Sequence, residues 1–381
     1  MEFKLTREQK RLRKDVLCFA KEHLFDASEN GNGSVAFSRD VWKKCGELKI
    51  TGLHVPDTHG GLGYDSTDTG LALEGLGAGG AGGGMITSLS AHLFSVVSPL
   101  LHFGSDAQKN AYLTSLADGT RMGASAMTED KTGTWSDDLA TVAEKDGDSF
   151  VLTGQKSFSI NAPEADLFLV YAKTNSGGVG NGITCFIVPK DASGLDVVPL
   201  EKSMGASDTP VGRVHLNEVR VPESAILGGV DEGKKVFEWA ATWERGMLGS
   251  VYVGWLDNLV EMCIKEARTR KQGKLPIGKH QSVSHKVTDM KINLEVSRLL
   301  SRKAAWSLSQ EQADDASAPI SKLFASESVL QSALDAVHVF GDYSILKEFQ
   351  LNATLQDALE SNFLGGGAQA QRRAIVKALG L

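Results

Sequence analysis

The sequence has little cysteine. Cys18, Cys45, Cys185 and Cys263 are the only ones among its 381 residues, and none belongs to a CxxC pair. Such isolated cysteines have neither the ligand spacing of a zinc site nor the pattern of a disulfide framework. We therefore expect four reduced thiols, no metal centre and a cytoplasmic protein.

Long apolar runs and a basic excess are also lacking. No apolar run in the sequence approaches the roughly 18–20 residues that a membrane span needs. The first eight residues include the charged Glu2, Lys4, Arg7 and Glu8 and no apolar stretch, unlike an export signal. Lys and Arg total 40 against 47 Asp and Glu, which gives a net charge of −7 and a sequence pI near 5.8. Because nucleic-acid binders neutralise phosphates with cationic side chains, this balance argues against them. We expect neither a membrane nor a nucleic-acid partner.

The length allows two or three domains, and the hydrophobic pattern changes twice along the chain. Residues 1–122 show mainly helical spacing, as in Val16, Phe19, Ala20 and Leu24. From Gly123 the period becomes that of short strands, and after Pro222 the helical period returns. The predicted fold is α+β and multidomain. It comprises an N-terminal helical domain (1–122), a middle antiparallel β-domain (123–228) and a C-terminal four-helix bundle (229–381).

One glycine-rich segment raises the question of a phosphate site. Residues Gly75–Gly84 contain seven glycines. A dinucleotide fingerprint needs a strand before the glycines and a helix that opens after them, whereas the preceding segment has a helical pattern. We interpret this segment as a flexible connection between helices.

Several short strings occur at characteristic separations. They are Thr128-Glu129, Gly133-Thr134, Gly154–Ala162, Arg270-Lys271-Gln272 followed by His280-Gln281, and His338–Asp342. The first two strings together resemble the motif TEPxAGS of the acyl-CoA dehydrogenase family. The other three resemble, in order, its motifs GxKxWITN, RxQFG…Q and QxxGG. The resemblance extends from one end of the chain to the other and implies the family's three-domain fold.

The resemblance also implies an FAD cofactor held at a subunit boundary, and therefore an oligomer, which we expect to be a homotetramer. The implied cofactor-binding residues are Met127, Thr128, Thr134, Phe158, Ser159, Ile160, Arg270, Gln272, Gln281, His338, Gly341, Gly367 and Gln369. Thr134, Arg245 and Gly366 are implied at the substrate. An arginine can clasp a diphosphate through bidentate bonds, although Arg270 also lies in a basic run typical of a solvated helix face.

The usual catalytic base of the family is missing. Its glutamate lies in a YEGT string, and the matching position here is Gly365, which has no titratable group. A second branch of the family carries the glutamate just before an arginine on another helix, where this sequence has Glu244-Arg245. Removal of a proton next to a thioester requires a carboxylate within reach, and burial beside Trp243 would raise its pKa towards neutrality. The resemblance therefore implies Glu244 as the base.

This relocated base, with Asn161-Ala162-Pro163, resembles the subgroup that oxidises prolyl or aminoacyl groups on peptidyl carrier proteins, through a phosphopantetheine arm, in natural-product pathways. Two alternatives stay open. One is an enzyme with another substrate, either an acyl-CoA dehydrogenase of fatty or amino acid degradation that acts on free CoA esters, or an oxidase that makes hydroxy- or aminomalonyl-type extender units. The other is a non-catalytic scaffold, suggested by departures from the motifs at Asp130, Ile160, Gly273 and Asp342. The sequence does not identify the acyl group or the electron acceptor.

Overall fold

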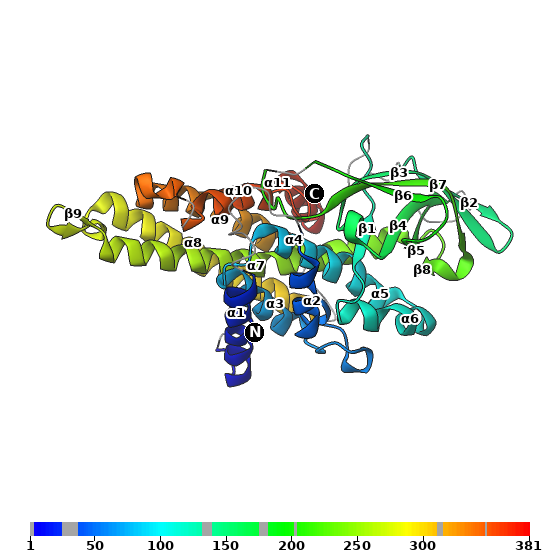
Figure 1. The fold of residues 1–381 in the computed structure, drawn as a ribbon, viewed down its shortest axis with the longest axis horizontal. Helices are drawn as coiled ribbons and strands as arrows, with labels where there is room; N and C mark the ends of the chain where they lie inside the picture. The colour runs from blue at the N-terminus through cyan, green and yellow to red at the C-terminus, as the bar shows by residue number, and fades with distance from the viewer. Residues whose placement is uncertain are drawn as a thin grey trace.

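The computed structural model describes residues 4–24, 37–131, 139–174, 182–201, 204–310, 315–346 and 349–381. The molecule is elongated (Figure 1), with a bundle of long helices at one end, a β-domain at the other and the N-terminal helices along one side. This order of helices, strands and helices confirms the predicted three-part fold.

The N-terminal part is built from helices with clear start signals. Thr6 and Ser105 form capping boxes with Gln9 and Gln108, which satisfy free backbone N–H groups at the first turns of α1 and α6. The elements are α1 (Arg7–His23), α2 (Arg39–Glu47), η2 (Ile50–Gly52), η3 (Asp57–His59), α3 (Ser66–Ala78), α4 (Gly83–His92), η4 (Leu93–Val97), α5 (Ser98–Phe103) and α6 (Asp106–Ala117).

The β-domain is one sheet of eight strands, in which β1 pairs with β4 and the others follow the order β6-β7-β3-β2-β4-β5-β8. The strands are β1 (Gly123–Ala126), β2 (Val142–Asp146), β3 (Ser149–Ile160), β4 (Leu167–Thr174), β5 (Ile183–Pro189), β6 (Leu195–Pro199), β7 (Val211–Pro222) and β8 (Ile226–Leu227), with short turns η5 (Ala162–Glu164) and η6 (Glu223–Ala225). The prediction of a purely antiparallel sheet was wrong in one respect, since β1 and β2 each run parallel to β4. Strand β1 enters directly from the N-terminal helices and so is not constrained by a hairpin.

The C-terminal part packs around α7, a helix of 37 residues. Its elements are α7 (Gly233–Thr269), β9 (Lys271–Gln272), β10 (Leu275–Pro276), η7 (Ile277–Lys279), α8 (Gln281–Leu308), α9 (Ser317–Phe340), η8 (Gly341–Ile345), α10 (Leu351–Ser361) and α11 (Ala368–Ala378). Helix α7 packs against α3, α8 and α9, so that it joins the N-terminal helices to the bundle. The small hairpin β9–β10 lies at the tip of the bundle, far from the β-domain (Figure 1).

The glycine-rich segment differs from its interpretation as a flexible connection. Gly75 and Gly77 lie inside α3, and only Gly79–Gly82 connects α3 to α4. A Cβ atom at Gly77 would come within 2.4 Å of the Val251 carbonyl oxygen on α7. These helical glycines therefore permit close approach of two helices, which is a packing role.

The expectation that no apolar stretch approaches the length of a membrane span was wrong for one helical segment. The continuous helical stretch Gly83–Phe103 is long and apolar enough to cross a membrane by length and composition, because α4, η4 and α5 join without a break. However, 89% of its apolar window is buried inside the protein. A core helix passes the same test, and burial explains its composition.

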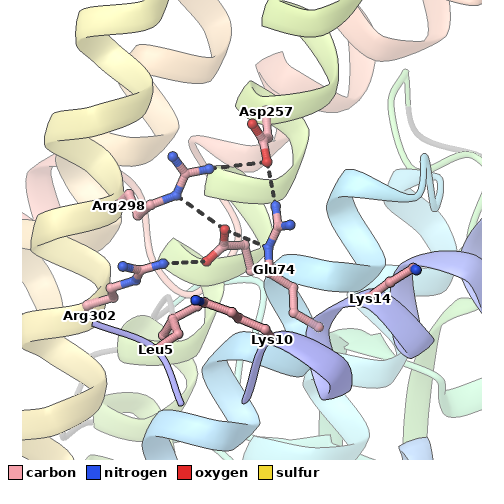
Figure 2. A pocket seen from close by; sticks show the side chains of 8 residues that line it. Leu5, Lys10, Lys14, Glu74, Asp257, Arg298 and Arg302 are labelled. Atoms are coloured by element: carbon pink, nitrogen blue, oxygen red, sulfur yellow. Dashed lines mark hydrogen bonds and ion pairs between the residues drawn. The ribbon is translucent and has the colours of Figure 1, made fainter. Parts of the chain in front are cut away.

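A network of buried charges ties four helices together (Figure 2). Glu74 of α3 has a side chain only 5% exposed and accepts from Arg13 of α1 and Arg298 of α8 at 2.9 and 3.2 Å. Asp257 of α7 also pairs with Arg13 and Arg298. The network borders a hollow of about 670 Å³ that further includes Leu5, Lys10, Lys14 and Arg302. Asp257 lies about 220° around α7 from Glu244 by helical periodicity, so this hollow opens on the opposite face.

We predict that Glu74→Gln lowers the free energy of unfolding by about 3–5 kcal/mol, because Arg13 and Arg298 lose the more buried of the two carboxylates that they share. Urea unfolding followed by circular dichroism would measure the loss. Glu223→Gln is the control, since the Glu223–Lys145 pair is half-exposed and such pairs contribute at most about 1 kcal/mol. Equal midpoints for the two variants would contradict the structural role of the network.

Candidate active site

A cavity of about 380 Å³ lies where the β-domain meets the helices. Its walls come from α4 and η4, from the loop after β1, from β3, from α7, and from the loop that joins α10 to α11. The residues that line it are Ala91, Ser95, Ser125, Met127, Thr128, Ser157, Phe158, Ile160, Phe237, Ala241, Glu244, Phe363, Leu364, Gly365, Gly366, Gly367 and Ala370.

Strand β3 presents an aromatic ring at this cavity through an irregular backbone. The pairing of β3 with β7 shifts register between Lys156 and Ser159, as at a β-bulge, which commonly re-aims a side chain near a functional site. Phe158 in this bulge has a φ of +54° and is 63% exposed. Ser157 beside it lines the cavity, and its buried hydroxyl has no hydrogen-bond partner in the described part of the chain. A planar group with polar edges would satisfy both features.

The motif residues Glu129 and Lys156 hold this wall in place. The Lys156 side chain is fully buried and donates to Glu129 at 2.8 Å and to the Met127 carbonyl oxygen at 3.2 Å. Glu129 also accepts from the backbone N–H of Thr141 at 3.0 Å. Because a buried charge must be paired and hydrogen-bonded, this pair fixes the loop of Met127 and Thr128 against β3.

Glu244 faces the cavity from α7 in apolar surroundings. The preceding Trp243 lies 5.6 Å from the His54 ring and 6.4 Å from the Phe94 ring between centroids. Burial raises the pKa of Glu244 to about 7, and the charges of Arg245 and Lys322 and the Ser95 hydroxyl oppose that rise. This direction agrees with the sequence-based expectation of a pKa raised towards neutrality. A group with this pKa can exchange a proton at physiological pH.

Gly365, where the family's usual base would lie, is directly beside Glu244. A Cβ atom on Gly365 would stand 3.9 Å from the Glu244 carboxyl carbon and 2.8 Å from Leu248 Cδ1. Gly365 also has a φ of +62°, which favours glycine. The two alternative positions for a carboxylate therefore converge on one point of the cavity.

The remaining predicted residues near the cavity are placed as follows. Ser159 and Arg245 are buried next to cavity-lining neighbours, and Gln369 is exposed on the first turn of α11. Thr134 lies outside the described residues. Asp130 points away to Arg213, at 3.8 Å, and Gln155, at 3.5 Å.

A second group of predicted residues lies at the far tip of the bundle. Arg270 donates to the Phe340 carbonyl oxygen at 2.6 Å and stacks 4.6 Å from the Tyr343 ring, so it joins the end of α7 to the turn after α9. The other members, which are exposed, are Gln272, Gln281, His338 and Gly341. Gly273 makes the tight turn of the β9–β10 hairpin with a φ of +63°, and Asp342 is exposed in the turn after α9. Arg270 is 26 residues from Glu244 along α7, or roughly 40 Å at 1.5 Å per residue.

Several lining residues were missed in the sequence. Ala91 and Ser95 belong to α4 and to η4, a short π-helix, and Phe237 and Ala241 belong to α7. A π-helical turn is often found at functional sites, but nothing in the apolar string Leu93–Val97 predicts one. The aromatic Phe237 and Phe363 look like ordinary core residues in a sequence.

Three sequence profiles cover almost all of the chain. They describe the acyl-CoA dehydrogenase N-terminal domain at residues 6–120, the middle domain at 124–219 and the C-terminal domain at 231–380. The chain belongs to the acyl-CoA dehydrogenase family. The profiles follow the helical, β and helical parts of the structure in order.

Curated relatives within the family include enzymes that act on carrier proteins. The chain is 36% identical over 347 residues to an L-prolyl-[peptidyl-carrier protein] dehydrogenase of Pseudomonas fluorescens, covering 91% of each chain. It is 33% identical to an enzyme of the same name from a Serratia species, covering 100% of this chain and 99% of that one. Among solved structures, the prolyl acyl carrier protein oxidase AnaB is 34% identical, with a TM-score of 0.94 and coverage of 99% and 100%. PigA with FAD and proline is 33% identical, with a TM-score of 0.96 and full coverage of both chains.

Proposed function

We propose that this acyl-CoA dehydrogenase family member is an FAD-dependent enzyme of natural-product biosynthesis. It oxidises an acyl or aminoacyl group held as a thioester on the phosphopantetheine arm of an acyl or peptidyl carrier protein, in the cytoplasm. The observation that carries the proposal is the Glu244 carboxyl group in a cavity shared with the glycine loop at residues 365–367. The similarity to prolyl carrier-protein enzymes supports the substrate class.

The cavity suits the flavin ring of FAD. Phe158 and Ile160 offer apolar contact, and the buried Ser157 hydroxyl and the half-buried Thr128 offer polar contact to a ring edge. Ile160 lacks the hydroxyl group that the family usually has at this position, so Ser157 and Thr128 would supply the polar contact to the ring edge. FAD, when bound, supplies the two-electron acceptor for a hydride.

Glu244 is the group that we assign to proton removal. Its carboxylate takes the proton from the α-carbon of the thioester, the electron pair of that C–H bond forms the Cα=Cβ bond, and a hydride leaves the β-carbon. The pKa near 7 makes the carboxylate a sufficient base at neutral pH without a large cost of ionisation. A scaffold without chemistry would not require a carboxyl group of raised pKa in this cavity.

We predict that Glu244→Gln reduces flavin reduction by the substrate about 10²–10⁴-fold, because the amide keeps the shape but cannot accept the proton. In the parent, kcat/KM should fall as the pH drops below about 7, since protonation removes the base form. Stopped-flow absorbance measures both, with Glu261→Gln on the exposed face of α7 as the control. A Gln variant with the parental rate and flavin content would exclude Glu244 as the base.

We predict faster oxidation of a prolyl group on a peptidyl carrier protein than of the same group on CoA. A carrier contributes binding energy outside the cavity, which a free CoA ester cannot reproduce. Mass spectrometry of both thioesters under identical conditions would follow the loss of two hydrogen atoms. A higher kcat/KM for the CoA ester would instead favour an enzyme of acyl-CoA degradation, and oxidation of neither would point to another acyl group.

We further propose that the protein is a homotetramer in which FAD bridges two subunits. Arg270 lies roughly 40 Å along α7 from Glu244 in the cavity, which is too far for one chain to bind both ends of a single FAD. Helix α8 carries Ile292, Leu299 and Trp306, which are 39–55% exposed and spaced by seven residues, so they form one apolar stripe on the bundle. A second copy would cover that stripe and bring its own Arg270 towards this cavity.

We predict that Leu299→Glu lowers the oligomer mass in light scattering and reduces the bound FAD, because a charge on an apolar interface is desolvated without a partner. Leu48→Glu is the control, since Leu48 is 51% exposed at the end of α2, away from the bundle. A monomeric parent with a full complement of FAD would contradict the shared site.

A further inference from the structure

The C-terminal segment is basic in an acidic protein. No acidic residue follows Glu360, although the net charge of the chain is −7. Helix α11 in this segment carries Arg372, Arg373 and Lys377, which are all exposed. The helix lies where the bundle meets the β-domain (Figure 1). A local excess of one charge at such a place attracts a partner of the opposite charge.

Two of these cationic side chains lie in line with a wall of the active-site cavity. Ala370 of α11 lines the cavity, as does Phe363, which is 69% exposed and so marks where the cavity opens to solvent. Residues three and seven positions along a helix lie on the same face. Arg373 and Lys377 therefore continue the face of Ala370 outwards from this opening. Long side chains on a helix lean towards its N-terminus, which here is the end next to the cavity.

Helix α7 carries a matching row on the other side of the opening. Phe237 and Glu244 line the cavity from one face of α7. Lys234 is half-buried and lies on the same face, one turn before Phe237. Lys377 of α11 pairs with Glu238 of α7 at 3.5 Å, which places the outer ends of the two rows close together.

The positive charge here is only partly neutralised by the protein itself. Glu232 pairs with Lys235 at 2.6 Å, and Glu327 pairs with Arg372 at 3.0 Å. Arg373 makes no ion pair within the described part of the chain. A guanidinium group in this state can form bidentate, charge-assisted bonds with an anion from outside.

The distance from Glu244 to this opening matches the length of a phosphopantetheine arm. Lys234 is ten residues before Glu244 on α7, or roughly 15 Å at 1.5 Å per residue. The arm has about 13 bonds between its sulfur and phosphorus atoms, and an extended chain advances roughly 1.1–1.2 Å per bond, so the arm spans about 15 Å. With the thioester beside Glu244, the phosphate group of an extended arm therefore reaches the level of Lys234.

We propose that Lys234, Arg373 and Lys377, which we call the cationic rim, form the docking surface for the carrier protein, an inference that rests on the proposed function. The rim binds the phosphodiester at the end of the arm and the carboxylates of an acidic carrier face around the serine that holds the arm. Exposed charges of this kind act mainly on the rate of encounter, and salt weakens them.

Charge reversal on the rim separates docking from chemistry. The variants are Lys234→Glu, Arg373→Glu and the two combined. The matched control is Lys14→Glu, since Lys14 is exposed on α1 and borders the hollow on the opposite face of α7. Each FAD-loaded enzyme is assayed with a prolyl group on a peptidyl carrier protein and with the same group on pantetheine, which has neither phosphate nor protein.

We expect kcat/KM for the carrier substrate to fall about 10-fold in each single variant and about 10²-fold in the combined variant, within the range of electrostatic steering. The value for the pantetheine thioester should stay at the parental level, as should both values in Lys14→Glu. Added NaCl should lower the parental kcat/KM for the carrier substrate more steeply than that of the combined variant.

Binding of the carrier with its arm but without an acyl group gives a readout that does not depend on the reaction. Isothermal titration calorimetry should show a weaker Kd for the rim variants than for the parent and Lys14→Glu. Equal losses with both thioesters would overturn the docking surface, as would parental kinetics and parental carrier affinity in the combined variant. A parent that oxidises neither thioester would overturn the proposed function instead, and the carrier affinities would still decide the docking surface.

Discussion

Burial of a carboxyl group makes its ionisation costly, and the surroundings of Glu244 set how far its pKa rises. Burial disfavours the charged form of Glu244, whereas Arg245, Lys322 and the Ser95 hydroxyl favour it. A carboxylate with an ordinary low pKa would be a weak base, and one with a much higher pKa would be protonated at neutral pH. The pKa of about 7 avoids both problems. Arg245 is next to Glu244 on α7, but Ser95 comes from η4 and Lys322 from α9, so these parts of the chain must pack together before the Glu244 carboxyl group has this pKa.

The long helix α7 makes that assembly possible. It packs against α3 of the N-terminal part and against α8 and α9 of the bundle, and it carries Glu244 on one face and Asp257 on the opposite face. The Asp257 side carries the ion-pair network with Arg13 and Arg298, whereas the Glu244 side faces the cavity. One helix therefore separates a structural charge cluster from the candidate catalytic centre.

Glycine has a specific part in the site. Loss of the side chain at Gly365 leaves room for Glu244 from another helix, and the positive φ of Gly365 and Gly366 lets their carbonyl groups turn towards Lys322 and Gln371. The Glu244 carboxyl group and the glycines of this loop are thus parts of one arrangement. The same residue type in α3 serves a different purpose, since Gly77 permits close contact with α7.

The sequence by itself determined the three-part order of the fold and the relation to acyl-CoA dehydrogenases. It also predicted Glu244 with a pKa near neutrality. The order of the three parts follows from local periodicity, and the family relation follows from short motif strings such as Thr128-Glu129 and Gly154–Ala162, whereas the pKa of Glu244 depends on burial and on groups from other elements. The tertiary structure alone decided the parallel pairing of β1 and β2 with β4, the burial of Gly83–Phe103 and the two distant groups of predicted cofactor residues. It also decided the contacts of Ser95, Lys322 and Gln371, because hydroxyl, ammonium and amide groups gain such partners only when folding brings distant parts of the chain together.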